Sequence, residues 1–170
     1  MRQTTGMDII IRPARADELE EAGRITADAF IADGHTSPDG AYAPRLRDAR
    51  ARSVAAEVLV AVDAADDTLL GCVTFAPPGS PWGDIARDGE AEFRMLGVDP
   101  AARGRGAGEA LVLACVERAR ALGVRQLVMS TQQSMSEAHR IYERLGFRRT
   151  PDRDWSPVPD VDLFTYALPL

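Results

Sequence analysis

Residues 95–109 read MLGVDPAARGRGAGE, and this stretch decides the fold. An apolar run ends just before Pro100, which breaks the strand, and alternating glycines then open a helix. Because glycine lets the backbone approach a ligand closely, the amides of residues 104–108 are able to converge on one point. Unpaired amides at a helix N-terminus form an anion site, and Arg103 and Arg105 add positive charge to it. The stretch therefore predicts a turn that binds pyrophosphate.

Two other nucleotide-binding motifs do not fit this turn. A Rossmann fingerprint needs GxGxxG inside a βαβ unit, with an acidic residue about 20 positions later. The spacing here is GxGxG, and it lies in mid-chain. A P-loop needs a lysine that reaches the phosphates, whereas all 20 cationic residues of this chain are arginine. A glycine-rich loop with surface arginines remains the alternative at this point.

The composition bounds the molecule and excludes several chemistries. With 170 residues, of which 45% are hydrophobic, the chain fits one domain with its own core. The absence of lysine excludes a Schiff-base anchor, and the absence of asparagine excludes N-glycosylation sites. A net charge of -6 with scattered arginines argues against nucleic acid or an anionic membrane as a partner. The residue bias itself is typical of a GC-rich bacterial genome.

The cysteines and the start of the chain indicate a cytoplasmic protein. Cys72 and Cys115 are too few for a disulfide framework, and each lies in an apolar run, so we expect buried, reduced thiols. The first residues lack the apolar core of a signal peptide, and no uncharged apolar run approaches about 18 residues. We expect residues 1–7 to be a disordered leader and residues 8–170 to form a single domain.

Hydrophobic periodicity and turn residues predict a mixed α/β layout over one sheet rather than the regular alternation of a doubly wound fold. We expect strands at 8–12, 57–62, 68–75, 91–98, 126–131 and 164–168, with a short strand after 146–147. We expect helices at 17–31, 41–56, 103–122 and 134–145.

A second segment, residues 134–147 (SMSEAHRIYERLGF), forms an amphipathic helix followed by a turn. Together with the glycine turn it resembles the GCN5-related N-acetyltransferase (GNAT) superfamily. The family's Arg/Gln-x-x-Gly-x-Gly/Ala signature is matched by Arg103, Gly106 and Gly108. Its later A-x-x-x-Y-E-x-L-G-F element is matched by Ala138, Tyr142, Glu143, Leu145, Gly146 and Phe147.

The resemblance implies a single-domain GNAT-like α/β fold, with a mixed, mostly antiparallel central sheet flanked by about four helices. It implies transfer of an acetyl group from acetyl-CoA to a primary amine by direct attack, without a metal. The acceptor is a small-molecule or peptide amine of unknown identity, and a homodimer is one expectation for the assembly. A non-catalytic sensor of CoA or acyl-CoA and an unrelated nucleotide-binding protein are the competing hypotheses.

The resemblance also assigns residues to acetyl-CoA. Backbone groups of one strand segment would meet the pantetheine arm, namely Leu96, Gly97 and Val98. The pyrophosphate would be held by Arg103, Gly104, Arg105, Gly106, Ala107 and Gly108. Many members carry an asparagine where this chain has Met135, so a hydrogen bond to the cofactor there falls to Ser134, to Ser136 or to the backbone.

Two residues are candidates for proton transfer. Tyr142 matches a family tyrosine that lies near the thioester sulfur and acts as general acid, although a tyrosine on an apolar helix face is often a core residue. Glu92 is the candidate base, because a period of two places it on one strand face with Arg94, Leu96 and Val98. Its alternatives are an exposed edge carboxylate or a partner of Arg94.

Three further residues have side chains that are able to transfer a proton. Glu90 is the reserve base, while His35 and His139 are expected to be solvated. For the acceptor, the family implies the loops at 33–42 and 77–88, with Trp82 and Trp155 as walls. Acidic loop residues would attract a cationic amine, namely Asp33, Asp39, Asp84 and Asp88.

Overall fold

The computed structural model describes residues 8–133 and 135–170, so the expected leader at 1–7 and Ser134 lie outside the described residues. The strands are β1 Ile9–Pro13, β2 Glu57–Asp63, β3 Leu69–Ala76, β4 Glu90–Val98, β5 Gln126–Gln132, β6 Arg148–Arg149, β7 Trp155–Val158 and β8 Val161–Pro169. The helices are α1 Leu19–Ala32, α2 Ala43–Arg47, α3 Ala49–Ala55, α4 Ala107–Leu122 and α5 Ser136–Arg144. Short 3-10 turns lie at Ala16–Glu18, Pro100–Ala102 and Pro151–Arg153.

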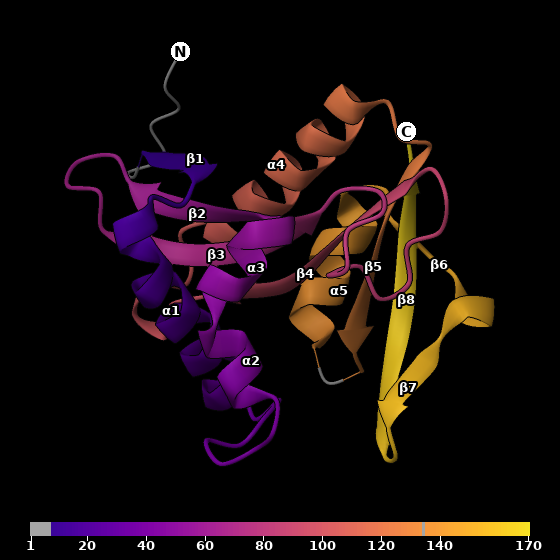
Figure 1. Cartoon of the computed structure of the whole chain (residues 1–170), viewed down its shortest axis with the longest axis horizontal. Helices are drawn as coiled ribbons and strands as arrows, with labels where there is room; N and C mark the ends of the chain where they lie inside the picture. The colour runs from indigo at the N-terminus through magenta and orange to yellow at the C-terminus, as the bar shows by residue number, and fades with distance from the viewer. Residues whose placement is uncertain (1–7, 134) are drawn as a thin grey trace.

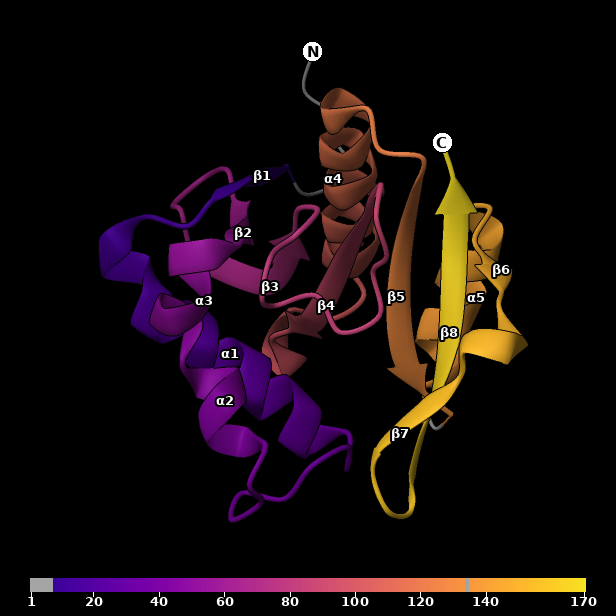
Figure 2. The ribbon, with the colours of Figure 1, turned by 45° about the vertical axis from the view of Figure 1, so that its right-hand side comes forward.

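One mixed sheet organises the molecule, in the strand order β1-β2-β3-β4-β5-β8-β6, with β7 paired to β8. The β4–β5 pair is parallel and the other described pairs are antiparallel, which confirms the predicted mixed, mostly antiparallel sheet. The parallel ladder joins only Glu90–Glu92 to Gln126–Val128. Beyond it the two strands diverge, as Figure 2 shows.

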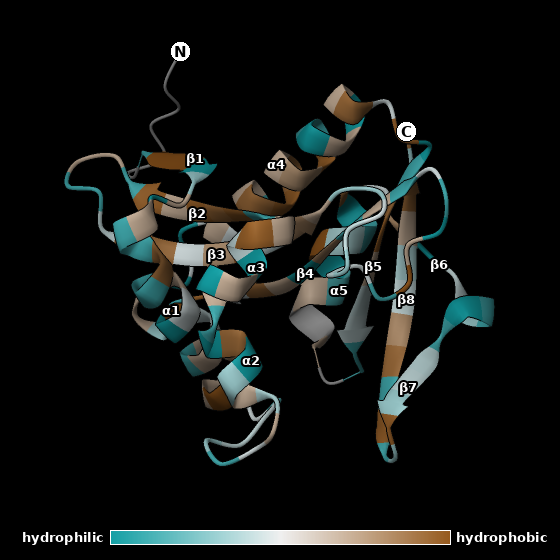
Figure 3. Ribbon diagram, viewed as in Figure 1, coloured by the Kyte–Doolittle hydropathy of each residue, from teal (hydrophilic) through white to brown (hydrophobic). Residues whose placement is uncertain are grey.

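Helices cover both faces of the sheet (Figure 1). Helices α1 to α3 pack on one face, where α1 and α3 bury an apolar cluster against β2 and β3. Helices α4 and α5 cover the opposite face, over a larger core that includes Phe93, Leu111 and Cys115. In Figure 3, β1 and β2 are largely hydrophobic, whereas β7 and the turn before it are mostly hydrophilic. Cys72 and Cys115 are both buried free thiols, as predicted.

The predicted helix at 41–56 is two helices, so five helices flank the described sheet. The break lies at Asp48, which follows the last residue of α2 and precedes the first residue of α3. Its side chain accepts a hydrogen bond from the amide of Ala51 and so caps α3. The carbonyls at the end of α2 are bound by the guanidinium of Arg52, which donates to the oxygens of Arg45 and Leu46. A capped break of this kind leaves the apolar period intact, so periodicity alone did not reveal it.

Two other boundaries differ from the prediction. The helix expected from residue 103 begins at Ala107, because Gly104 and Gly106 both have a φ of 82°, which no right-handed helix contains. The strand β7 was not predicted, since Pro157 lies inside it. Proline is tolerated there because β7 has a single described partner, β8, and is an edge strand.

Candidate active site

The glycine turn presents a row of free backbone donors. Among the described residues, the amides from Gly104 to Glu109 donate to no acceptor, and the first bond of the helix runs from Ala110 to the oxygen of Gly106. The left-handed glycines at 104 and 106 turn successive N–H groups toward one side, which forms an anion-binding nest at the start of α4. This geometry fits a diphosphate.

The arginines of the turn are already paired with carboxylates. Arg103 makes a two-pronged contact with Asp33, at 2.7 and 2.9 Å, and both side chains are exposed. Arg105 contacts Asp63 at 3.0 Å, and the hydrogen bond from the amide of Ala65 together with this pairing lowers the pKa of the Asp63 carboxyl. The backbone amides of the turn are therefore available to a ligand, while its two arginine side chains are neutralised by Asp33 and Asp63.

The edge of β4 that faces β5 is the second feature that fits a CoA arm. Parallel pairing stops at Glu92, although β4 continues to Val98 and β5 to Gln132. The strand edges beyond Glu92 therefore have no ladder partner in each other, which leaves peptide groups of β4 available to an extended ligand. The segment 96–98 leads directly from this edge into the glycine turn.

A β-bulge at Met95 corrects the predicted strand face. From Cys72 to Thr74 the partner strand advances two residues, while β4 advances three, from Gly97 back to Arg94. Met95 accommodates the extra residue with a φ of 57°. A bulge shifts the alternation by one residue, so Leu96 and Val98 pack against the core on the α4 face.

The prediction that Glu92, Arg94, Leu96 and Val98 share one face is therefore wrong. Glu92 and Arg94 point to the α1–α3 face, opposite to Phe93, which lies in the core beside α4. Gly97 also faces α1, where a Cβ would lie 3.2 Å from the side chain of Ala29. The bulge thus separates the charged half of β4 from the half that leads into the glycine turn.

Glu92 is a buried carboxylate held by backbone. Its side chain is 1% exposed, and Oε1 accepts hydrogen bonds from the amides of Ile85 and Ala86, at 2.8 and 3.0 Å. Its other oxygen, Oε2, has no hydrogen bond to any described residue. Burial raises its pKa to about 7, and the neighbouring Asp84 adds to the rise. Glu92 therefore has one oxygen fixed by the backbone, and its pKa allows the other oxygen to accept a proton near neutral pH.

Glu90, the reserve base, has a different environment. It is fully buried, and Arg153 donates to both of its oxygens, at 2.9 and 3.1 Å. Arg125 is a further ion partner at 3.0 Å, and Gln126 and the amide of Arg87 also donate to it. Although burial opposes ionisation, these donors lower its pKa to about 2. Glu90 is therefore a structural anion and not a base.

Arg94 does not pair with Glu92, which was one alternative reading of the sequence. Its guanidinium binds Asp84 at 3.0 Å, the carbonyl of Trp82 at 3.0 Å and the hydroxyl of Tyr42 at 3.4 Å. Asp84 and Asp33 are thus engaged by arginines, so neither is an unpaired anion for a cationic acceptor. Sequence reasoning missed this node, since its members come from three separate segments.

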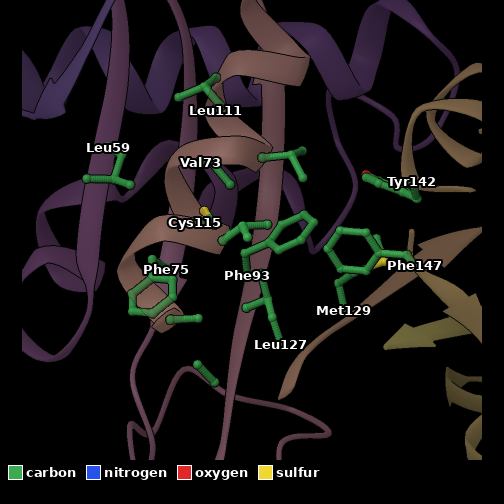
Figure 4. Close-up of a cluster of buried hydrophobic side chains, with 14 of the residues drawn as sticks. Leu59, Val73, Phe75, Phe93, Leu111, Cys115, Leu127, Met129, Tyr142 and Phe147 are labelled. Atoms are coloured by element: carbon green, nitrogen blue, oxygen red, sulfur yellow. The ribbon is translucent and has the colours of Figure 1, made fainter. Parts of the chain in front are cut away.

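Tyr142 lies in an aromatic cluster on the other face of the sheet, beside Phe93 and Phe147, with ring centroids 5.9 Å away in both cases. It is 4% exposed, and its hydroxyl has no hydrogen bond to a described residue. Figure 4 shows its hydroxyl end directed toward β4. Burial raises its pKa, so it is a neutral phenol that retains its proton.

The remaining sequence candidates have defined surroundings. Met135 packs on the apolar cluster around Met95 and receives a hydrogen bond on its sulfur from Thr131 at 3.3 Å. His139 is not the solvated residue we expected, because its ring contacts those of Phe164 and Tyr166, with centroids 6.1 and 5.8 Å away. Ser134, the predicted cofactor contact, lies outside the described residues.

Glu92 and Tyr142 lie on opposite faces of the sheet, close to the point where β4 and β5 stop pairing. Phe93 links them, because it follows Glu92 in β4 and packs against the ring of Tyr142. A substrate that reaches this point would therefore meet a proton acceptor from one face and a proton donor from the other. In residues 8–133 and 135–170 no cluster of three His, Cys, Asp or Glu side chains is placed to bind a metal, and no helix is long and apolar enough to cross a membrane.

Comparisons with known proteins agree with this geometry. Residues 20–147 match the family model of the acetyltransferase (GNAT) family. Mycothiol acetyltransferase of Geodermatophilus obscurus is 33% identical over 149 residues, which are 85% of this chain and 46% of that protein. The same enzyme of Saccharopolyspora erythraea is 36% identical over 91 residues, which are 54% of this chain and 27% of that protein. The chain thus spans less than half the length of these two relatives.

Solved structures show the same fold over nearly the whole chain. A GNAT-family acetyltransferase from Staphylococcus aureus Mu50 aligns with a TM-score of 0.73 at 15% identity, covering 95% of this chain and 99% of that one. A GCN5-related N-acetyltransferase from Kribbella flavida aligns with a TM-score of 0.70 at 28% identity, covering 95% and 98%. The protein yncA from Salmonella typhimurium, solved with its cofactor acetyl-CoA, aligns with a TM-score of 0.67 at 24% identity, covering 95% of this chain and 94% of that one.

Proposed function

Since the chain belongs to the acetyltransferase (GNAT) family, we propose that it transfers an acetyl group from acetyl-CoA to a primary amine. The observation that carries the proposal is the placement of Glu92 and Tyr142 on either side of the end of the β4–β5 ladder. The reactive atoms of both side chains, Oε2 of Glu92 and the hydroxyl of Tyr142, make no hydrogen bond to any described residue.

The residues present fit acetyl-CoA. The free amides from Gly104 to Glu109 match the diphosphate, and the unpaired edge of β4 at 96–98 matches the amide groups of the pantetheine arm. Helix α4 adds the positive end of its dipole to this site. When bound, acetyl-CoA supplies an activated acetyl thioester. Ion pairing of Arg103 and Arg105 with Asp33 and Asp63 does not oppose this fit, since the backbone donors stay free.

Glu92 takes the role of general base. A primary amine is protonated at neutral pH and must lose a proton before its nitrogen has a lone pair for attack. Oε2 of Glu92 accepts that proton while Oε1 stays bound to the amides of Ile85 and Ala86. A pKa of about 7 matches the base to neutral pH, where it is ionised and still basic enough to take the proton.

Tyr142 takes the role of general acid. As the amine nitrogen forms its bond to the acetyl carbon, the bond to sulfur breaks and the departing thiolate needs a proton. The nitrogen loses one further proton as it becomes an amide, and this loss balances the proton that the thiolate takes up. The buried hydroxyl of Tyr142 remains protonated at physiological pH and donates to the sulfur. Aromatic neighbours on both sides hold its ring in place.

A broad acceptor screen tests the proposal. The purified protein is incubated with acetyl-CoA and a panel of primary amines, release of free CoA thiol is followed, and acetylated products are identified by mass spectrometry. We expect turnover with at least one amine class. Thermal stabilisation by CoA with no turnover on any amine would instead establish a sensor, and tighter binding of NAD or ATP than of CoA would contradict both.

A further inference from the structure

Three charged side chains at alternate positions of β4 bind the loop that precedes the strand, residues 77–89. Glu90 accepts a hydrogen bond from the amide of Arg87. Glu92 accepts hydrogen bonds from the amides of Ile85 and Ala86. Arg94 donates to the carbonyl of Trp82 and pairs with Asp84. The loop therefore runs back along its own strand, with each successive side chain of β4 binding a point closer to the start of the loop.

Arg94 differs from the other two because it also reaches a second loop. Its Nη2 donates to the hydroxyl of Tyr42, just before α2, at 3.4 Å. The same Nη2 lies 3.0 Å from Oδ2 of Asp84, while Nη1 lies 3.0 Å from the carbonyl of Trp82. The side chain is only 11% exposed, so these contacts are made away from bulk water. One guanidinium thus ties the loop before α2 to the loop before β4.

The two loops contribute aromatic side chains to one apolar cluster. Tyr42 and Trp82 pack on Phe30, Leu46 and Met95, and Met135 joins from the start of α5. Met95 is the bulge residue, three positions after Glu92 on the same strand. The half-buried rings of Tyr42 and Trp82 therefore lie on the α1–α3 face beside the candidate base, where the carbon skeleton of an acceptor amine would approach it.

Asp84 connects this node to the base directly. It precedes Ile85, whose amide donates to Oε1 of Glu92, and a Cβ on Gly83 would lie 3.4 Å from the same oxygen. If Arg94 no longer held Asp84 and Trp82, the amides that fix Oε1 would lose the anchor on their N-terminal side, while Glu90 would still bind the amide of Arg87 on their C-terminal side. The charged groups that act on Glu92 are Asp84 and Arg94, with opposite signs.

We propose that Arg94 is a positioning residue for both the acceptor and the base: it fixes the Tyr42 and Trp82 wall and the loop amides that orient Glu92. The wall is aromatic, the charges of Arg94 and Asp84 are paired with each other, and the guanidinium of Arg45 lies over the Trp82 ring, 5.7 Å from its centroid. The acceptor therefore carries an apolar or aromatic group next to its amine. The inference rests on the proposed acetyl transfer. Arg94 does not touch the reacting atoms, and it acts through the groups that do.

Three variants separate position from charge. Arg94→Met removes both the charge and the two-nitrogen guanidinium group. Arg94→Lys keeps the charge but not the guanidinium, and Tyr42→Phe removes only the hydrogen bond between Arg94 and the Tyr42 hydroxyl. Arg118→Gln is the matched control, since it breaks an arginine–glutamate pair with Glu57 on the opposite face of the sheet. Each variant is assayed with 2-phenylethylamine and with methylamine, for kcat, for both KM values and for the pH dependence of kcat.

For Arg94→Met we expect kcat to fall at least about tenfold, because a catalytic group displaced by roughly 1 Å costs up to about 100-fold. We expect KM for 2-phenylethylamine to rise several-fold and KM for acetyl-CoA to stay within about twofold. The acidic limb of the pH profile should move to higher pH, since loss of the cation and of the amides raises the pKa of Glu92. Arg94→Lys should restore the pH limb but not KM, and Tyr42→Phe should raise KM alone.

A wild-type protein that turns over no amine contradicts the proposed function itself. If the wild type is active, two results overturn the inference: an Arg94→Met protein with unchanged kcat, KM and pH limb, or a wild type that prefers methylamine to 2-phenylethylamine in kcat/KM. If Arg94→Met fails to fold, Tyr42→Phe and Arg94→Lys decide, because an unchanged KM for 2-phenylethylamine in both contradicts the role in positioning the wall.

Discussion

The glycine turn and the Glu92 face of β4 are built on opposite principles. The turn is local: six consecutive residues with free amides, two of them glycines of positive φ, supply a site from backbone alone. The face is assembled from three segments, in which Tyr42 and Asp84 meet the side chain of Arg94 through their own side chains and Trp82 through its carbonyl. A backbone site tolerates changes in its side chains, whereas an assembled site changes its specificity with each of them. If the turn binds acetyl-CoA and the Glu92 face selects the acceptor, as we propose, cofactor binding and acceptor choice are able to vary independently.

The largest expected effect is on the Glu92 face of β4, the region assembled from three segments. Glu92→Gln removes the proton acceptor but keeps an oxygen for the amides of Ile85 and Ala86, so we expect kcat to fall by about 100- to 1,000-fold. KM for acetyl-CoA should not change. In the wild type, kcat should decline as the pH falls below about 7, and the variant should lose this limb. Glu117→Gln, on the exposed side of α4, is the control and should match the wild type.

The same variant separates activity from stability. A folded-state pKa of about 7, above the usual 4.5, means that folding disfavours the ionised carboxylate, so stability is lost as the pH rises from about 4.5 through about 7. We expect Glu92→Gln to raise the free energy of unfolding at pH 8 by roughly 1–3 kcal/mol and to change it little at pH 4. Urea unfolding at both pH values measures this. Equal effects at both would contradict the burial of an ionised base.

The next effect belongs to the opposite face of the sheet. Tyr142→Phe removes the proton donor and leaves the aromatic packing, so we expect kcat to fall by about 10- to 100-fold with both KM values unchanged. Tyr166→Phe is the matched control from the same cluster, where the hydroxyl donates to Glu143 at 3.3 Å. A Tyr142→Phe protein as fast as the wild type would remove the acid assignment.

A smaller effect is expected for a change in the glycine turn. Gly106 has a φ of 82° and open space where a Cβ would be, so Gly106→Ala strains the backbone without a clash. Strain of about 1–2 kcal/mol should raise KM for acetyl-CoA roughly 5- to 30-fold and leave the preference among amines unchanged. Gly108→Ala is the control, because its φ is not left-handed and its Cβ would make an ordinary contact with Val98. A changed amine preference in Gly106→Ala would show that the two sites are not independent.

The smallest effect concerns an ion pair between the end of α1 and the glycine turn. Asp33 at the end of α1 binds Arg103 of the glycine turn, and Asp33→Asn would release that arginine toward the phosphates. Because exposed ion pairs contribute about 0–1 kcal/mol, KM for acetyl-CoA should fall by no more than about fivefold. Isothermal titration with CoA measures the same change. An increase in KM would show that the pair supports the turn instead of competing with the ligand.

What the sequence could predict follows the same division. The sequence predicted a glycine turn after Val98 because glycine spacing and a strand-ending proline act over a few positions, but the helix that follows begins at Ala107 and not at residue 103. Glu92 was selected by strand period, but the period failed at Met95, since a bulge is favoured by pairing with β3 and leaves no composition signal. The sequence offers Glu92 as a partner of Arg94, whereas the actual partner, Asp84, comes close only because the loop folds back along β4. The helix break at Asp48 was hidden for a related reason: a capping side chain does not interrupt apolar spacing.

The short ladder between β4 and β5 also sets how the molecule comes apart in acid. Three paired residues join the N-terminal strands to the β5–β8–β6 unit, and Glu90 sits at this joint with Arg125 and Arg153 around it. With a pKa near 2, its contribution to stability is present above about pH 4.5 and is lost as the pH falls toward 2. Hydrogen exchange measured as the pH is lowered from about 4.5 to about 2 should therefore show the two units separating along this line as cooperative blocks, before either strand group exchanges within itself.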